Sequence, residues 1–389
     1  MRVEHQVRAF EQIFKEYDGV NPLHRFLFMY YKQHKQMGSS DRRWATRYIY
    51  SFFRLGKALI QENPLLRLAI ADFLCNADAS LVTSTYLPQL AEQVARPTAE
   101  KIELIQKAYP KFKLEDVFPF HAALSKSIDQ KLFFASFFVQ PDLFIRLNTA
   151  FAQQTFEALK QHAVPFNAIT EYTLALPNGT KLEQVLPVQK YYQVQDLSSQ
   201  QTGKFFKPQP WDKWWDCCAA SGGKSLLLHA LEPKVELLVS DVRENSLNNL
   251  DERFQEAGLK QYQKKVLDLL QNNDPDLHHY EFDGIILDAP CSGAGTWGRT
   301  PEMLYYFEDH KIDYFSRLQK NIAANVIKYL KPGKPLIYIT CSAFEQENEG
   351  VVHWMLENLP LELEEMELVK GYTQKADTMF VARLLKKAL

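Results

Sequence analysis

Cysteine is scarce in this sequence, and its spacing excludes several familiar uses of the residue. Five cysteines occur among the 389 residues, and none belongs to a C-x-x-C pair: Cys75, Cys217, Cys218, Cys291 and Cys341. An odd number without regular spacing does not fit a disulfide framework, and no cluster of His, Cys and Asp has the spacing of a metal site. We therefore expect a reduced, cytoplasmic protein that holds no metal.

Long apolar runs are also lacking. No stretch approaches the roughly 18 residues that span a membrane. The first residues lead into a charged amphipathic segment instead of an apolar leader, so no membrane partner is expected. Hydrophobic residues nevertheless make up 46% of the chain, which is enough for packed cores. The length predicts two or three domains, and we expect a monomer.

Net charge is small, at −2, but it is distributed unevenly. Residues 25–57 carry eight Lys and Arg against the single acid Asp41, a local balance of 8 − 1 = +7. Residues 345–367 carry eight glutamates and no Lys or Arg. A local basic field can bind nucleic-acid phosphate whatever the total charge. The basic segment therefore predicts an RNA contact, with a solvated helical face as the alternative.

The pattern of apolar residues divides the chain into three parts. Residues 1–112 have helical spacing and predict an all-α domain. Residues 113–188 predict connecting helices and a small α+β subdomain, with a strand at 143–147 and a helix at 151–162. A hairpin is expected over 172–183, turning at Asn178-Gly179, which is a dipeptide favoured in two-residue turns.

From residue 189 to 389, strands and helices alternate, which is typical of an α/β domain with a parallel sheet. The apolar runs predict strands at 213–218, 236–241, 264–268, 283–288 and 335–340, and a final pair near 366–370 and 379–385.

Two cysteines follow predicted strands, and each is itself followed by serine. Cys291 comes after the strand that ends at Asp288, and Cys341 directly follows the strand 335–340. Ligands bind at the carboxyl ends of strands in open α/β sheets, and neighbouring strands lie about 4.8 Å apart. Two thiols could therefore reach one small substrate. The alternative is that both cysteines only pack in the core.

A glycine-rich turn follows the first strand of this domain and predicts a cofactor site, because small residues let backbone N–H groups approach a ligand. Gly223-Lys224-Ser225 fits a nucleotide P-loop, but Cys218 stands in place of its leading glycine. Asp241 ends the next strand, 19 residues after Gly222, where an acid commonly binds ribose hydroxyls. Asp268 ends the third strand and could accept a hydrogen bond from an adenine amine. Alternatively, either Asp caps a helix.

Together these strand-end features favour S-adenosylmethionine over a nucleotide triphosphate. The expected cofactor-binding residues are Cys218, Ala219, Ala220, Ser221, Gly222, Gly223, Lys224, Asp241, Asp268 and Asp288.

The paired thiols suggest a particular methylation chemistry. Carbon 5 of a pyrimidine is a poor nucleophile until a thiolate adds to C6. A base must then remove the C5 proton so that the thiolate can leave. Such an enzyme needs a nucleophilic cysteine, a proton acceptor and an acid that hydrogen-bonds N3. Cys341, Cys291 and Asp288 would supply these roles, although physical reasoning alone leaves open which thiol attacks.

Four ordered motifs in the last 200 residues resemble the RsmB/Nol/Nop/Sun group of RNA cytosine-C5 methyltransferases. They lie at residues 194–200 (VQDLSSQ), 218–224 (CAASGGK), 288–293 (DAPCSG) and 340–342 (TCS), and the last is followed by residues 347–349 (ENE), which are also typical of the group. The resemblance implies a Rossmann-like class I methyltransferase domain. It also implies that Cys341 attacks C6 and that Cys291 assists product release. Ser221 departs from the group, which usually has proline there.

The N-terminal part resembles NusB-like RNA-binding domains through the helix that contains Asp41, Arg42 and Arg43. A NusB-like domain joined to this catalytic domain is the layout of bacterial small-subunit rRNA methyltransferases of the group, so 16S rRNA is the expected partner. The alternatives are a tRNA substrate, a non-catalytic RNA-binding assembly factor and a P-loop-like NTPase. Separately, the S-x-x-E spacing of Ser342 and Glu345 predicts a helix capping box.

Overall fold

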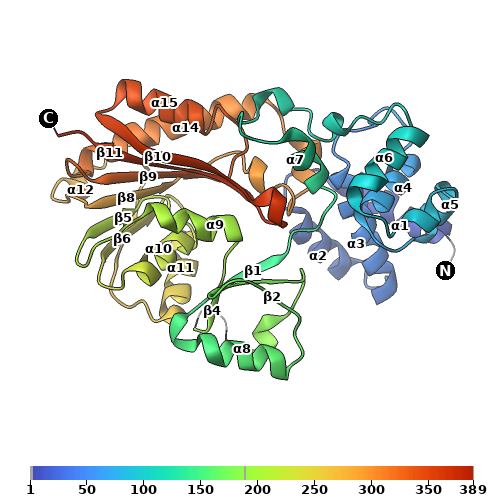
Figure 1. Cartoon of the computed structure of the whole chain (residues 1–389), viewed down its shortest axis with the longest axis horizontal. Helices are drawn as coiled ribbons and strands as arrows, with labels where there is room; N and C mark the ends of the chain where they lie inside the picture. The colour runs from blue at the N-terminus through green and yellow to red at the C-terminus, as the bar shows by residue number, and fades with distance from the viewer. Residues whose placement is uncertain (1–2, 188–189, 389) are drawn as a thin grey trace. The chain divides into compact units, whose positions relative to one another are not determined.

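The computed structural model describes residues 3–187 and 190–388 (Figure 1). The chain divides into two compact units. The first contains Met1–Leu124, Ile128–Pro141 and Thr296–Asp309, and the second contains Ser125–Ser127, Asp142–Gly295 and His310–Leu389. Among the described residues, no helix combines the length and the apolar character needed to cross a membrane.

The first unit is helical, as the periodicity of the first 112 residues predicts. Its α-helices are α1 (Val3–Glu16), α2 (Leu23–Gln33), α3 (Ser39–Arg54), α4 (Pro64–Cys75), α5 (Leu81–Tyr86), α6 (Thr98–Ala108), α7 (Gln130–Ser136) and α13 (Glu302–Tyr306).

Helix α13 reaches this unit from a distant part of the sequence. The Tyr305 ring lies edge-on to Phe14 of α1, with centroids 6.0 Å apart. The buried Glu302 carboxylate accepts a hydrogen bond from the backbone N–H of Leu23 at 3.0 Å. The segment that follows the Cys291 motif thus completes the aromatic core of the helical unit, which no local pattern indicates.

Two of the arginines in the basic segment 25–57 are structural. Arg47 pairs with Asp72 at 2.7 Å and with Asp78 at 2.6 Å. Arg54 is buried and donates to the carbonyl of Phe137 and to the side chain of Gln140, each at 2.7 Å. The positive field that the sequence suggests for this segment is reduced accordingly, and RNA contact by it stays a prediction.

The second unit begins with the small α+β subdomain. Strands β1 (Leu143–Leu147), β2 (Asn167–Thr170), β3 (Thr173–Leu176) and β4 (Tyr192–Val194) form a sheet in the order β2-β3-β1-β4, with every neighbouring pair antiparallel. Helix α8 (Ala152–Gln161) covers it through Leu159, which packs on β1 and β3 residues.

The predicted hairpin over 172–183 is wrong. Asn178 and Gly179 do turn, with Gly179 at φ +83°, but a short 3-10 helix follows at Leu182–Gln184 instead of a strand. Strand β3 pairs with β2 before it and with β1, because Leu174 and Leu176 must face the core under α8. The local turn preference of Asn-Gly is satisfied without a hairpin.

The rest of the second unit forms an α/β domain around a seven-stranded sheet. Its α-helices are α9 (Leu197–Gln201), α10 (Gly223–Leu231), α11 (Glu244–Ala257), α12 (Asp274–Leu277), α14 (His310–Val326) and α15 (Glu349–Asn358). Its strands are β5 (Lys213–Asp216), β6 (Glu236–Asp241), β7 (Gln263–Val266), β8 (Gly284–Asp288), β9 (Pro335–Thr340), β10 (Leu361–Lys370) and β11 (Thr378–Lys386).

The strand order is β10-β11-β9-β8-β5-β6-β7, and β11 is antiparallel to both its neighbours, whereas β9, β8, β5, β6 and β7 are parallel. Helices α10 and α11 cover one face and α14 and α15 the other (Figure 1). Each predicted strand lies within a few residues of an observed one, since the buried parallel strands are nearly continuous apolar runs. The order reverses between β5 and β8, where ligands bind in such sheets.

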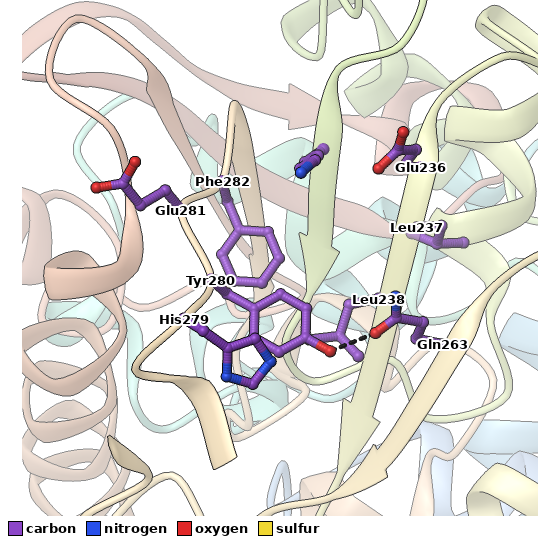
Figure 2. A pocket seen from close by; sticks show the side chains of 9 residues that line it. Glu236, Leu237, Leu238, Gln263, His279, Tyr280, Glu281 and Phe282 are labelled. Carbon is purple, nitrogen blue, oxygen red and sulfur yellow. Dashed lines mark hydrogen bonds between the residues drawn. The ribbon is translucent and has the colours of Figure 1, made fainter. Parts of the chain in front are cut away.

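A cavity of about 270 Å³ lies at the opposite, amino edge of the sheet (Figure 2). It is bounded by Lys213, Glu236 and Gln263 at the starts of their strands. The hydroxyl of Tyr280 donates a hydrogen bond to the side-chain carbonyl of Gln263 across it. None of the sequence motifs reaches this edge, because all of them follow the carboxyl ends of strands or lie on the helices beyond.

Candidate active site

The two cysteine motifs meet at the carboxyl ends of adjacent parallel strands. Strands β8 and β9 are paired so that Asp288 lies beside Ile339. Cys291 lies three residues beyond the end of β8, and Cys341 directly follows β9. Their sulfur atoms are 3.4 Å apart, and both residues are half-buried. The structure thus brings the two predicted catalytic thiols into direct contact.

The two thiols are not equivalent in their surroundings. The hydrogen bond to Cys341, followed by burial, raises the pKa of Cys291 well above its usual value, and the charge of Glu347 acts in the same direction. Cys291 therefore keeps its proton at neutral pH. In this state Cys291 can donate its hydrogen bond to the Cys341 sulfur.

A buried glutamate, Glu347, links the two cysteine loops. One carboxylate oxygen accepts from the backbone N–H of Ser292 at 2.9 Å and from the Gln319 amide at 3.1 Å. The other accepts from the Ser342 hydroxyl at 3.0 Å. Gln319 also donates to the Pro290 carbonyl at 3.0 Å. Glu347 therefore fixes the residue after each cysteine, and with it the separation of the thiols.

The predicted capping box of Ser342 and Glu345 is wrong. The Ser342 hydroxyl accepts from the Phe344 N–H at 3.0 Å, but helix α15 begins only at Glu349. Glu345 lies at the surface, 3.2 Å from Lys126. The residue that Ser342 binds is Glu347, which the sequence presents only as part of the ENE motif and which is absent from the predicted site.

The turn between β5 and α10 has a backbone that requires glycine. Gly222 is left-handed, with φ +81°, and a Cβ there would lie 2.3 Å from the Phe254 ring. Ala220 is also left-handed, with φ +46°. At Ser221, where the related group usually has proline, the hydroxyl and the carbonyl both accept from Arg253 of α11, at 3.2 and 3.3 Å. Residues of α11 therefore hold the turn in one conformation.

Two of the three predicted acids, Asp241 and Asp268, differ in burial and in hydrogen-bond partners. Asp241 is buried at the end of β6 and accepts from the Ala220 N–H at 3.0 Å and from Arg243. Asp268 lies two residues past the end of β7, is exposed, and accepts from the Leu270 N–H at 3.0 Å. Asp241 thus joins the glycine-rich turn, whereas no hydrogen bond among the described residues joins the Asp268 carboxylate to it.

Lys224 connects the turn to Asp288. Its ammonium donates to Asp288 Oδ2 and to the Ser199 hydroxyl, each at 2.9 Å, and the lysine side chain is only 8% exposed. Asp288 Oδ1 makes no hydrogen bond within the part of the chain that the structure describes. One oxygen of Asp288 is therefore anchored and the other is available to a ligand.

Asp216, at the end of β5, is a further acid beneath this site, which the sequence prediction missed. Burial raises its pKa from 3.8 to about 7, although a hydrogen bond of 2.6 Å from Ser225 opposes the shift. Its Oδ1 is buried and has no partner among residues 3–187 and 190–388. The strand-end rule that selected Asp241 and Asp268 also applies to Asp216, so the signal was present.

The strand order and the turn at its switch point define a Rossmann-like class I methyltransferase fold. Two solved structures share it. The crystal structure of PH0851 aligns over 98% of this chain and 98% of its own, with a TM-score of 0.71 and 21% identity. NSun6 from Pyrococcus horikoshii with SFG aligns over 74% of this chain and 98% of its own, with a TM-score of 0.58 and 18% identity. At these identities the likeness concerns the fold.

Sequence comparison finds similarity to one group of methyltransferases. Residues 204–387 match the family model described as 16S rRNA methyltransferase RsmB/F. Ribosomal RNA small subunit methyltransferase B of Salmonella arizonae is 31% identical over 54% of this chain and 52% of its own length. The protein of that name from Shewanella oneidensis is 36% identical over 41% of this chain and 37% of its own. The matched stretches span about half the length of these relatives or less. Residues 204–387 are therefore similar to the RsmB/F group of methyltransferases.

Proposed function

We propose that this protein transfers a methyl group from S-adenosylmethionine to C5 of a cytosine in structured RNA, through a covalent bond between Cys341 and C6. The observation that carries the proposal is the 3.4 Å contact between the Cys291 and Cys341 sulfur atoms beside the switch point of the sheet. Two thiols that only packed in a core would not need a buried carboxylate to hold both of their loops.

The residues of the β5–α10 turn fit the proposed cofactor. Positive φ angles at Ala220 and Gly222 shape the turn, and the missing Cβ at Gly222 lets the turn pack against Phe254 of α11. The turn is less suited to a polyphosphate, because the Lys224 ammonium is bound to Asp288 and Ser199. Residues 218–224, Asp241 and Asp288 would hold the cofactor, with Asp268 at its outer edge. Bound S-adenosylmethionine supplies an electrophilic methyl group.

In the first step, the Cys341 thiolate adds to C6 of the cytosine and makes C5 nucleophilic. Asp288, anchored by Lys224, would accept a hydrogen bond from the N4 amino group through its second oxygen, and N3 would take a proton from water as the thiolate adds. The contact with Asp288 orients the ring while electron density moves onto it. C5 would then take the methyl group while still carrying its proton, and the cofactor would leave as the neutral thioether S-adenosylhomocysteine.

In the second step, Cys291 removes the C5 proton, and the C6–S bond breaks to restore the aromatic ring and release Cys341. The pKa of Cys291 is raised first of all by its hydrogen bond to Cys341. Once the Cys341 sulfur is bound to carbon, it is no longer an ionisable partner and that cause is removed. Adduct formation would therefore lower the pKa of Cys291, although burial and Glu347 still raise it, and this favours Cys291 acting as the base after the attack.

We propose 16S rRNA as the substrate. The support is the match to rRNA small subunit methyltransferases. The target base must leave its stack to reach thiols at the strand ends, so a loop or a partly unpaired region is expected. A tRNA substrate is the second candidate, since the proposed catalytic residues contact only the cytosine base.

The test is bisulfite sequencing of total RNA from a strain that lacks this protein, complemented with the wild type or with Cys341→Ala. One cytosine in 16S rRNA should resist conversion only with the wild type. A protected cytosine in tRNA, and none in 16S rRNA, would show that tRNA is the substrate. Equal patterns in the presence and absence of the protein would contradict the methylation itself and favour a non-catalytic assembly factor.

A further inference from the structure

Arg146, in the small α+β subdomain, is a cation with no anionic partner among the described residues. Its Nε donates to the Gln195 side chain at 3.0 Å, and its two terminal nitrogens make no hydrogen bond to any described residue. The side chain is half-buried and lines a cavity of about 360 Å³ between β1 and α10. An unpaired guanidinium that has lost much of its water is unfavourable unless an anion binds it.

The charge of a second arginine, Arg253, acts on Arg146. Arg253 of α11 donates to Gln193, another residue of the cavity wall, at 3.1 Å. Burial, followed by the charge of Arg253, lowers the pKa of Arg146 to about 10. Arg146 lines the cavity, Arg253 holds Gln193 in its wall, and no carboxylate is among the charges that act on Arg146, so this wall is suited to a phosphate.

The rim of the cavity carries polar side chains that could hydrogen-bond to a nucleic-acid chain. Side chains able to hydrogen-bond line it at Asn148, Thr149, Tyr172, Gln193 and His229.

Just beyond the rim, the exposed Lys190 lies over the rings of Phe151 and Tyr191, 5.4 and 5.7 Å from their centroids. Asn148 joins the two regions by donating to the Lys190 carbonyl at 2.9 Å. Cations interleaved with aromatic rings are typical of sites that bind single-stranded RNA.

We propose that Arg146, with Arg253 beside it, binds a backbone phosphate of the RNA substrate. The proposal deepens the proposed function and rests on it. A phosphate held here fixes the strand on the same unit as the thiols, which helps to keep the target nucleotide in position after it leaves its stack.

A purely structural role for Arg146 makes a different prediction. The Gln195 amide that it holds donates to the Ser199 hydroxyl at 3.2 Å and to the Gly223 carbonyl at 3.4 Å. If Arg146 served only to position Gln195, its loss would disturb the cofactor turn. Gln195→Met would then reproduce the effect of Arg146→Gln, and both would raise the KM for S-adenosylmethionine.

The experiment compares Arg146→Gln with Arg96→Gln, which removes the same charge from an exposed arginine paired with Glu100. The Kd for a 16S rRNA fragment is measured over a range of salt concentrations, and the Kd for S-adenosylmethionine is measured separately. Arg146→Gln should weaken RNA binding about five- to tenfold and reduce the salt slope by about 0.7–0.9, the value of one lost phosphate contact. Cofactor binding and the Arg96→Gln variant should match the wild type.

An unchanged RNA affinity and salt slope in Arg146→Gln would overturn the proposal, as would a loss confined to cofactor binding. Inorganic phosphate provides the second arm. If millimolar phosphate stabilises the wild type but not Arg146→Gln, while RNA affinity is equal in both, the site takes a small phosphate ligand instead. A failure of the proposed function can be told apart from a failure of the phosphate site. In that case the wild type would methylate no RNA, whatever its affinity for RNA.

Discussion

Cys291 and Cys341 are 50 residues apart in the chain, yet their sulfur atoms lie 3.4 Å from each other at the ends of neighbouring strands. The contact makes the proposed division of labour testable. Cys291→Ala should retain attack and lose release, so that a covalent protein–RNA adduct accumulates and survives denaturing electrophoresis. Cys341→Ala should form no adduct, because it lacks the attacking sulfur.

Cys75→Ala serves as the control, since Cys75 belongs to helix α4 of the other unit. It should turn over as the wild type does. An adduct with Cys341→Ala and none with Cys291→Ala would exchange the two roles.

The Glu347 contacts predict a loss of both stability and activity when the carboxylate is removed. In Glu347→Ala, the Ser292 N–H, the Ser342 hydroxyl and the Gln319 amide lose their shared acceptor. One buried unsatisfied group costs about 1–3 kcal/mol, so the free energy of unfolding should fall by at least that amount. Methylation should slow by more than tenfold, because the thiols lose their fixed separation.

Glu345→Ala is the matched comparison, since it removes a carboxylate two residues away that pairs with Lys126 at the surface. A surface pair contributes about 0–1 kcal/mol. Urea denaturation and single-turnover rates should therefore separate the two variants clearly, and equal behaviour would contradict the role assigned to Glu347.

A pair of glycines tests the shape of the cofactor turn. Gly222 and Gly258 have nearly the same left-handed backbone, with φ +81° and +82°. A Cβ at Gly258 meets nothing within 4 Å, whereas one at Gly222 would clash with Phe254. Gly258→Ala should cost about 1 kcal/mol of stability through strain alone. Gly222→Ala should cost more and should also weaken S-adenosylmethionine binding in calorimetry. Equal cofactor affinity in both variants would argue against this turn as the binding site.

Asp216 predicts a specific pH dependence of stability. Its pKa rises from 3.8 to about 7 on folding, so the folded protein holds this proton more tightly than the unfolded chain does. The stabilising effect of the proton is complete below about pH 4 and is lost as the pH rises to about 7, for a total of up to about 4 kcal/mol. In Asp216→Asn, the free energy of unfolding should lose this part of its slope between pH 4 and 7. An unchanged slope would contradict the shift.

Local patterns in the sequence were enough to find the strands and the residues at their ends. A buried parallel strand is a nearly continuous apolar run, and the residue that ends it is the first polar one. The residues Gly222, Asp241, Asp288 and Cys341 therefore lie at one edge of the sheet, as the sequence pattern predicts. Asp216 obeys the same rule and could have been included.

Contacts between distant segments could not be found in this way. Glu347 binds Gln319 across 28 residues and Ser292 across 55, and the spacing of Ser342 and Glu345 suggested a different partner. The Asn178-Gly179 turn formed as expected, but the pairing of β3 was decided by which leucines reach the core under α8.

The sequence by itself determined where the strands end and which chemical groups stand there, because backbone periodicity and side-chain chemistry are encoded within a few residues. Only the tertiary structure decided the strand order that brings Cys291 to Cys341, the carboxylate that holds their loops, and the unpaired charge of Arg146. These features depend on burial and on contacts across tens to hundreds of residues, whose energies exist only when the chain is folded.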